Sequence, residues 1–201
     1  MRGYAIGLAC LLVLAAGAAA WAVQEGDMII APEVGFAAMN GELGQMLGGD
    51  IAYGVTLAYG VIDWLAIEAD TLYSLHEQAD KDETGEISTS HFIGGIGPRF
   101  NWNTRYVIPY LTLQGAASFL RYKSEWEGPR KTLKDQNDAH AFGGLGGLGV
   151  DFVIADAFTV GLFGKAGYLK SNLEYSNQQD RDQEAGAYGY FAGGLRLTMI
   201  F

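Results

Sequence analysis

Cysteine, basic residues and long apolar runs are all scarce in this chain of 201 residues. Cys10 is the only cysteine, so no disulfide can form within the chain. The chain has only 13 Lys and Arg against 23 Asp and Glu, which gives a net charge of −10. That balance argues against a nucleic-acid partner, which needs a basic surface. After residue 22 no segment is apolar enough for a transmembrane helix, so helical membrane spans are excluded from the rest of the chain.

The first 22 residues have the pattern of an export signal. Arg2 is the only positive charge there, Tyr4–Ala19 is apolar and small, and Ala20-Trp21-Ala22 matches a small-x-small cleavage site. A retained membrane anchor is the alternative, because the apolar run has nearly the length of a span. The polar residues that follow favour cleavage after Ala22. We therefore predict a signal peptide over 1–22 and one domain over 23–201.

Most of the predicted domain alternates between apolar side chains and small or polar ones. A β-strand shows this period of two, because successive side chains point to opposite faces. Each alternating segment has about 10 residues or more, which is what a tilted strand needs to cross a bilayer. The eight segments are 28–38, 51–61, 65–75, 91–102, 106–120, 141–153, 158–170 and the C-terminal run from 187.

The predicted connections alternate between short and long. The short ones are 62–64, 101–105 and 154–157, and the long polar ones are 39–50, 76–90, 121–140 and 171–186. Short turns on one rim and long loops on the other are typical of an up-and-down transmembrane barrel. A soluble barrel or sandwich also alternates, but its polar face carries many charges. Here that face is rich in Gly, Ala, Ser and Thr, which favours the membrane barrel.

The C-terminal strand carries a family resemblance. Phe191, Leu195, Leu197 and Met199 share one face with the terminal aromatic Phe201. Gly97-Pro98-Arg99-Phe100 and Pro109-Tyr110 are similar to segments common in small bacterial outer-membrane β-barrels. The chain thus resembles that family, with its OmpA transmembrane-domain, OmpX and OmpW types. The resemblance implies an all-β, eight-stranded, antiparallel up-and-down transmembrane β-barrel in the cell outer membrane. It also implies that Phe201 belongs to the signal read by the barrel-assembly machinery.

Ionisable residues on the polar face are predicted to point into the barrel. Because an unpaired charge away from water costs several kcal/mol, we expect these residues to pair and plug the lumen. One alternative is that these charges line an ion path. Another is that a β-bulge reverses which face some of them occupy. The predicted set comprises three acids and three bases: Glu33, Glu68, Asp70, Arg99, Lys165 and Arg196.

The long segments differ in charge. Segment 121–140 is the basic one, and its cations are candidates for contact with lipopolysaccharide phosphates. Carboxylates in 76–90 and 171–186 have no fixed ligand spacing, so we predict a solvated acidic rim with no metal and no cofactor. The basic set comprises Arg121, Lys123, Arg130, Lys131 and Lys134.

The sequence does not predict an enzyme. Some small outer-membrane barrels modify lipid A with a Ser, His and acid set. Here His76, His91 and His140 lie near the long-loop rim, where solvated histidines are the simplest interpretation. No serine stands two residues from a histidine within one predicted strand.

Three functions therefore remain. The first is a structural or surface-interaction barrel, whose loops meet an extracellular ligand or a host surface. The second is a narrow OmpW-like conduit for small hydrophobic solutes, with backbone pairing interrupted at Pro32, Pro98 or Pro109. The third and weakest is a lipid A-modifying enzyme.

Overall fold

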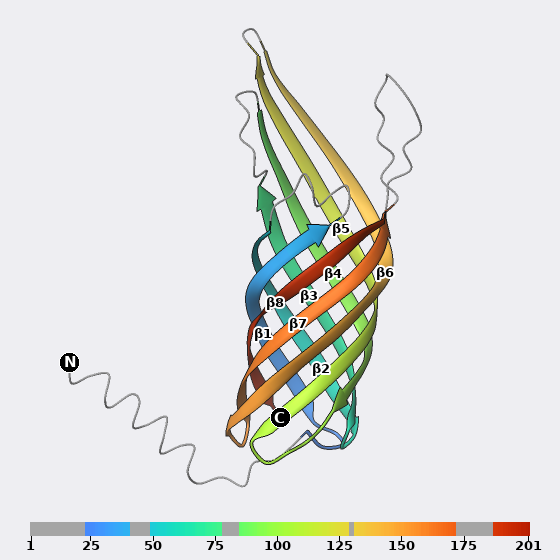
Figure 1. The fold of residues 1–201 in the computed structure, drawn as a ribbon, viewed down its shortest axis with the longest axis vertical. Coiled ribbons are helices and arrows are strands. Elements are labelled where there is room, and N and C mark those ends of the chain that lie inside the picture. Colours follow the sequence, from blue (N-terminus) through green and yellow to red (C-terminus); the bar gives the residue numbers. More distant parts are fainter. Residues whose placement is uncertain (1–22, 41–48, 78–84, 129–130, 172–186) are drawn as a thin grey trace, which may run out of the picture.

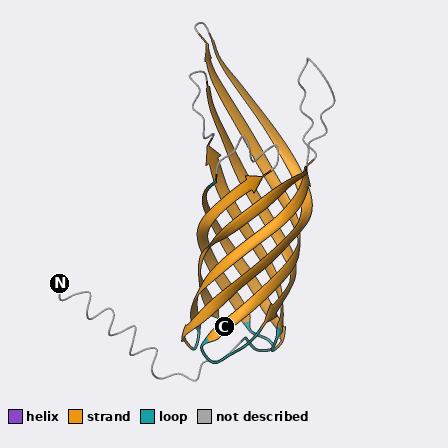
Figure 2. Cartoon of the chain, in the orientation of Figure 1, coloured by secondary structure: helices purple, strands orange, loops and turns teal. Residues whose placement is uncertain are grey.

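The computed structural model describes residues 23–40, 49–77, 85–128, 131–171 and 187–201. These residues form a closed barrel of eight strands in chain order, visible in Figures 1 and 2. The fold is the predicted all-β, antiparallel, up-and-down barrel. The strands are β1 (Met28–Asn40), β2 (Asp50–Ile62), β3 (Leu65–Glu77), β4 (Gly85–Asn101), β5 (Val107–Gly128), β6 (Lys131–Ala155), β7 (Phe158–Ser171) and β8 (Ala187–Ile200).

The first and last strands close the sheet on itself. β1 pairs antiparallel with β8 from Ile29↔Ile200 to Asn40↔Gly189. The backbones of Met28 and Phe201 also exchange two hydrogen bonds, of 3.0 and 2.9 Å. Closure leaves no free strand edge, as a barrel in a bilayer requires. Across the described residues, no helix is long and apolar enough to cross a membrane.

Burial alternates along the strands as the sequence predicts. In β2 the odd-numbered residues from Ile51 to Val61 are exposed on the outer face, whereas Thr56 inside is fully buried. Tyr59, at 53 % exposed, marks the turn side of this apolar face and Tyr53, at 58 %, the long-loop side. Large apolar side chains therefore cover the outside of the barrel, as contact with lipid requires.

Two predicted loops are wrong in extent. β4 begins at Gly85 rather than His91, and the segment 121–140 is not a loop. β5 and β6 pair continuously as far as Gly128↔Lys131 and form a hairpin that rises above the other strands in Figure 1. Polar residues occupy both alternating positions of this segment, so it lacks the apolar alternation that marks a strand with one buried face.

Two of the three prolines on the described strands coincide with gaps in backbone pairing, whereas Pro109 pairs with Val150 in an unbroken β5–β6 ladder. Beside Pro32, the β1–β8 ladder lapses between Ile30↔Met199 and Glu33↔Arg196, with the same register on both sides. Beside Pro98, the β4–β5 ladder lapses between Ile96↔Gly115 and Arg99↔Thr112. Because proline has no N–H to donate, a short gap without a register shift is its simplest accommodation.

An apolar cluster closes the turn end of the lumen. Val23 and Ile29 are each 1 % exposed and pack with Ala58 and Ala66, with Ile200 against them. The side-chain amide of Asn103 donates a 2.8 Å hydrogen bond to the backbone oxygen of Val23. An apolar layer therefore lies at the turn end of the lumen, next to the charged part.

Candidate functional site

The candidate site is the charged middle of the lumen. All six ionisable residues predicted to point inward lie there, and Asp151 joins them from β6. None of the seven side chains is more than 5 % exposed. The set therefore comprises four carboxylates and three cations, one acid more than the sequence analysis counted, and ion pairs connect them all.

Arg99 stands at one end of this network. Its guanidinium contacts Glu68 at 3.1 Å and Asp151 at 2.9 Å. Its Nε donates a 2.7 Å hydrogen bond to the amide oxygen of Asn101. Gln114 donates a further hydrogen bond of 3.1 Å to Glu68. A buried arginine with two carboxylates and an amide has its fork of donors largely satisfied, which offsets its desolvation.

A tyrosine joins the two arginines. The guanidinium carbon of Arg99 lies 3.9 Å from the centre of the Tyr110 ring, and that of Arg196 lies 4.7 Å from it. Arg196 also donates a 2.9 Å hydrogen bond to the Tyr110 hydroxyl and contacts Asp151 at 3.2 Å. The ring thus attracts both guanidinium groups through cation–π contacts.

Lys165 forms the third part of the network. Its Nζ lies 2.8 Å from Glu33 and 2.6 Å from Asp70. Glu33 continues to Arg196 at 3.8 Å and accepts a 2.8 Å hydrogen bond from the Thr56 hydroxyl. Glu33 therefore links Lys165 with the arginine and tyrosine group, so the charges form one network.

Inward-facing glycines make room for these side chains. Gly161 stands opposite both Asp151 and Arg196 in its ladders, and a Cβ on it would collide with the Asp151 carboxylate. A Cβ on Gly149 would collide with the Tyr110 ring. The lumen of an eight-stranded barrel is only just wide enough for side chains, so each long one needs a small residue beside it.

The alternation of side chains along the strands identifies more of this site than the six predicted residues. Alternation with a period of two also puts Asp151 and Tyr110 on the inner face, but the predicted network contains neither. The missing information was proximity between strands that do not pair. Asp151 and Arg99 lie on β6 and β4, with β5 between them, and only the curvature of the closed barrel brings them together.

Two histidines were misplaced. His76 and His91 are each 0 % exposed and point into the upper lumen, not into solvent at the rim. β3 extends to Glu77, so Ser74 and His76 do stand two residues apart on one strand, with a 2.8 Å hydrogen bond between Oγ and Nε2. His91 lies 3.3 Å from the hydroxyl of Tyr188. The pair faces the lumen, out of reach of lipid acyl groups. His140 faces outward, as the sequence allowed.

Phe201 and Arg121, the other predicted site residues whose side chains the structure describes, lie outside the lumen. Phe201 is 70 % exposed at the turn end. Arg121 on β5 forms an exposed 3.0 Å ion pair with Asp138. Lys123, Lys131 and Lys134 lie on the strands of the β5–β6 hairpin, and Arg130 falls outside the described residues. Among described side chains, no group of three or more His, Cys, Asp or Glu is placed to hold a metal ion.

Comparison with known proteins identifies the family. The model of the outer membrane protein beta-barrel domain matches residues 6–187. The chain therefore belongs to the outer membrane protein beta-barrel domain family. No curated protein sequence matches it.

Solved structures share the fold at low sequence identity. OprG from Pseudomonas aeruginosa is 12 % identical with a TM-score of 0.60, over 90 % of this chain and 98 % of that one. Ail, the attachment invasion locus protein of Yersinia pestis, is 12 % identical with a TM-score of 0.51, over 89 % and 100 %. Neisserial surface protein A is 13 % identical with a TM-score of 0.50, over 86 % and 98 %. The chain is an outer-membrane β-barrel protein of this general type.

Proposed function

We propose that this protein is a structural and surface-interaction barrel of the outer membrane with a plugged lumen. The observation that supports this most is the buried network of seven charged side chains, none of them more than 5 % exposed. Paired charges that fill a lumen leave no continuous water path, and they fix the barrel's cross-section. On this proposal the signal peptide 1–22 is removed, and the assembly machinery reads Phe201.

The β5–β6 hairpin is the part of the chain that we propose meets the exterior. β5 and β6 have 22 and 25 residues, against 13 in each of β1, β2 and β3. Arg121 and three lysines on these strands favour an anionic partner, such as lipopolysaccharide or a host polyanion. Ail has been solved in complex with the heparin analogue sucrose octasulfate. Retention on heparin-agarose tests this part of the proposal. The folded wild-type barrel should be retained more strongly than a variant whose hairpin is shortened between residues 122 and 137.

A conductance measurement tests the plug. We expect the purified barrel to show no steady conductance in planar bilayers. Arg99→Ala leaves Glu68 and Asp151 without their main cation and should lower the free energy of unfolding by about 3–5 kcal/mol. It should still open no large conductance, because the neighbouring ion pairs remain. A large steady conductance in the wild-type protein would contradict the plug.

A narrow conduit for small hydrophobic solutes is the second candidate. The observation that favours it is the pair of ladder gaps beside Pro32 and Pro98. Against it, the Glu33 and Arg196 side chains occupy the lumen beside the first gap. Solute uptake into proteoliposomes, faster with the barrel than without it, would favour the conduit.

We propose no enzymatic activity. The buried Ser74–His76 pair has the hydrogen bond of a nucleophile and its base, but both side chains are at most 1 % exposed. A substrate would have to enter the lumen to reach them. Mass spectra of lipid A from cells with and without the protein should be identical, and a mass change that depends on Ser74 would overturn this view.

A further inference from the structure

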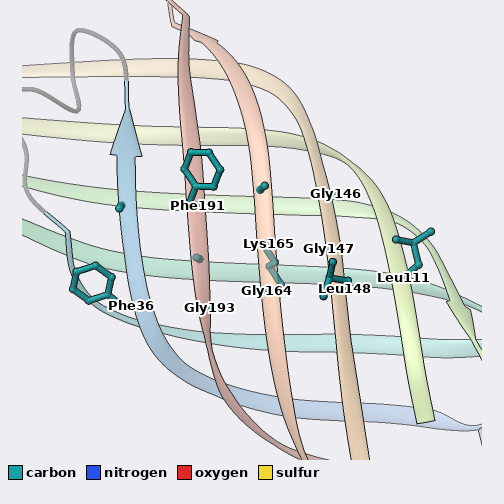
Figure 3. Close-up of a pocket in the computed structure, with 12 residues that line it drawn as sticks. Phe36, Leu111, Gly146, Gly147, Leu148, Gly164, Lys165, Phe191 and Gly193 are labelled. Atoms are coloured by element: carbon teal, nitrogen blue, oxygen red, sulfur yellow. The ribbon is translucent and has the colours of Figure 1, made fainter.

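The outer wall of the barrel is hollowed along β7. A groove of about 580 Å³ lies on the lipid-facing side, and Figure 3 shows its walls. Phe36 and Phe191 stand on one side, and Leu148 and Leu111 on the other. These side chains are 38–67 % exposed, so they project away from the sheet.

The strand register explains why the outer face lacks large side chains there. One row of paired residues crosses five strands, from Phe36 on β1 through Gly193, Gly164 and Leu148 to Leu111 on β5. Phe36 begins the row, Leu148 and Leu111 end it, and the two positions between them are glycines. The next row up the strands places Ala166 between Phe191 and Gly146. The floor is therefore backbone and methyl groups, and its centre follows the outward face of β7.

Gly146 and Gly164 have open space on the outer side of the sheet. A Cβ on Gly146 would meet nothing closer than 4.0 Å, and the same holds for Gly164. These two residues therefore differ from Gly161 in the lumen, whose Cβ would collide with Asp151. Side chains are therefore not excluded at Gly146 and Gly164 by packing within the barrel, and their absence leaves the groove open toward lipid, whereas a Cβ on Gly193 would lie 3.3 Å from the backbone oxygen of Phe163.

Cations lie at the upper end of the groove. Along the outward face of β7, Gly164 and Ala166 are followed by Tyr168 and Lys170, and both of these last side chains are exposed. Lys170 lies four residues above Ala166, roughly 13 Å along the strand. Arg121 lies higher at this rim on β5, where its guanidinium forms an exposed 3.0 Å ion pair with Asp138. An apolar groove that ends at positive charge is complementary to an acyl chain that ends at an anionic headgroup.

We propose that this groove binds one acyl chain of lipid A, the phosphorylated glycolipid of the outer leaflet, with a phosphate at Lys170. The proposal rests on the proposed function, which places the hairpin rim outside. Lys170 pairs with Phe142, which pairs with Ala117, so Arg121 lies two strands away and four residues higher on β5, roughly 16 Å from Lys170. Two cations that far apart suit the two separated phosphates of lipid A better than the single phosphate of phosphatidylglycerol. Tyr168, between groove and cation, occupies the position of an interfacial aromatic.

Native mass spectrometry of the folded barrel, mixed in detergent with lipid A or phosphatidylglycerol, tests the proposal. We expect one lipid A molecule to be retained in preference to phosphatidylglycerol. Ala166→Leu fills the groove and should abolish most of that retention. Ala69→Leu makes the same change on the lipid face of β3, away from the groove, and should leave retention unchanged.

Charge variants test the headgroup. Lys170→Gln should weaken lipid A retention about fivefold, the effect of one cation near a lipid phosphate. Arg105→Gln removes an exposed cation at the opposite rim and should have no effect. Gly146→Val is a second groove variant, in case Ala166→Leu does not fold, and heat-dependent electrophoretic mobility reports folding for each protein.

Three outcomes would overturn the proposal. Equal retention by Ala166→Leu and Ala69→Leu would show that the groove does not hold the chain. Equal retention of phosphatidylglycerol would remove lipid A as the ligand. Loss of a dimer in Ala166→Leu, with lipid retention unchanged, would make a second copy of the barrel the occupant. In each case the proposed function would stand, because the conductance of the plugged lumen is measured separately.

Discussion

Arg99 and Tyr110 lie face to face at the centre of the lumen, with the guanidinium carbon 3.9 Å from the ring centre. Arg196 approaches the same ring, at 4.7 Å. Tyr110 thus contacts two buried cations that would otherwise repel each other. This relationship makes Tyr110 part of the network together with the carboxylates.

Substitution of Tyr110 tests that role. Tyr110→Leu removes two buried cation–π contacts, so we expect the free energy of unfolding to fall by about 2–4 kcal/mol. Tyr110→Phe keeps the ring and loses only the hydrogen bond from Arg196, which should cost about 1–2 kcal/mol. Urea unfolding in lipid vesicles, followed by tryptophan fluorescence, measures both. Equal losses in the two variants would show that the hydroxyl, and not the ring, is what matters.

The two carboxylates that share Lys165 should differ in importance. Glu33 contacts Lys165, Arg196 and the Thr56 hydroxyl, whereas Lys165 is the only cation paired with Asp70 within the described lumen. Glu33→Gln should therefore lower the free energy of unfolding by about 3–5 kcal/mol. Asp70→Asn should cost less than about 2 kcal/mol, because Lys165 keeps Glu33 and the variant balances three carboxylates against three cations. The same unfolding assay decides, and an Asp70→Asn loss as large as that of Glu33→Gln would refute the ranking.

Glycines on the two faces of the wall should respond differently to the same change. Gly161→Val places a side chain against the Asp151 carboxylate, so we expect overpacking to cost about 1–3 kcal/mol. Gly115→Val is the matched control on the lipid face, where a Cβ would meet nothing within 4 Å, and its effect should stay within about 0.5 kcal/mol. Both values come from unfolding midpoints and slopes in urea. A destabilised Gly115→Val with a stable Gly161→Val would reverse the assignment of the two faces.

The sequence predicts the barrel well because a bilayer imposes a simple rule on every strand. Apolar side chains must face lipid, so the period of two is preserved along β2, where every outward residue from Ile51 to Val61 is apolar. The short turns fix the order of neighbouring strands. The pattern fails at the long-loop end of the barrel, where the β5–β6 hairpin continues without apolar alternation, and where β3 carries His76 inward beyond the predicted end at Leu75.

The sequence alone thus determined the eight strands, the inward direction of Glu33, Glu68, Asp70, Arg99, Lys165 and Arg196, and the apolar outer face, because all of these follow from local alternation. Only the tertiary structure decided which charges meet. Arg99 reaches Asp151 across β5, and Lys165 reaches Asp70 across the lumen, because closure curves the sheet and brings distant inner faces together. The groove along β7 is equally a tertiary feature, since it forms where the register aligns glycines of neighbouring strands in one row.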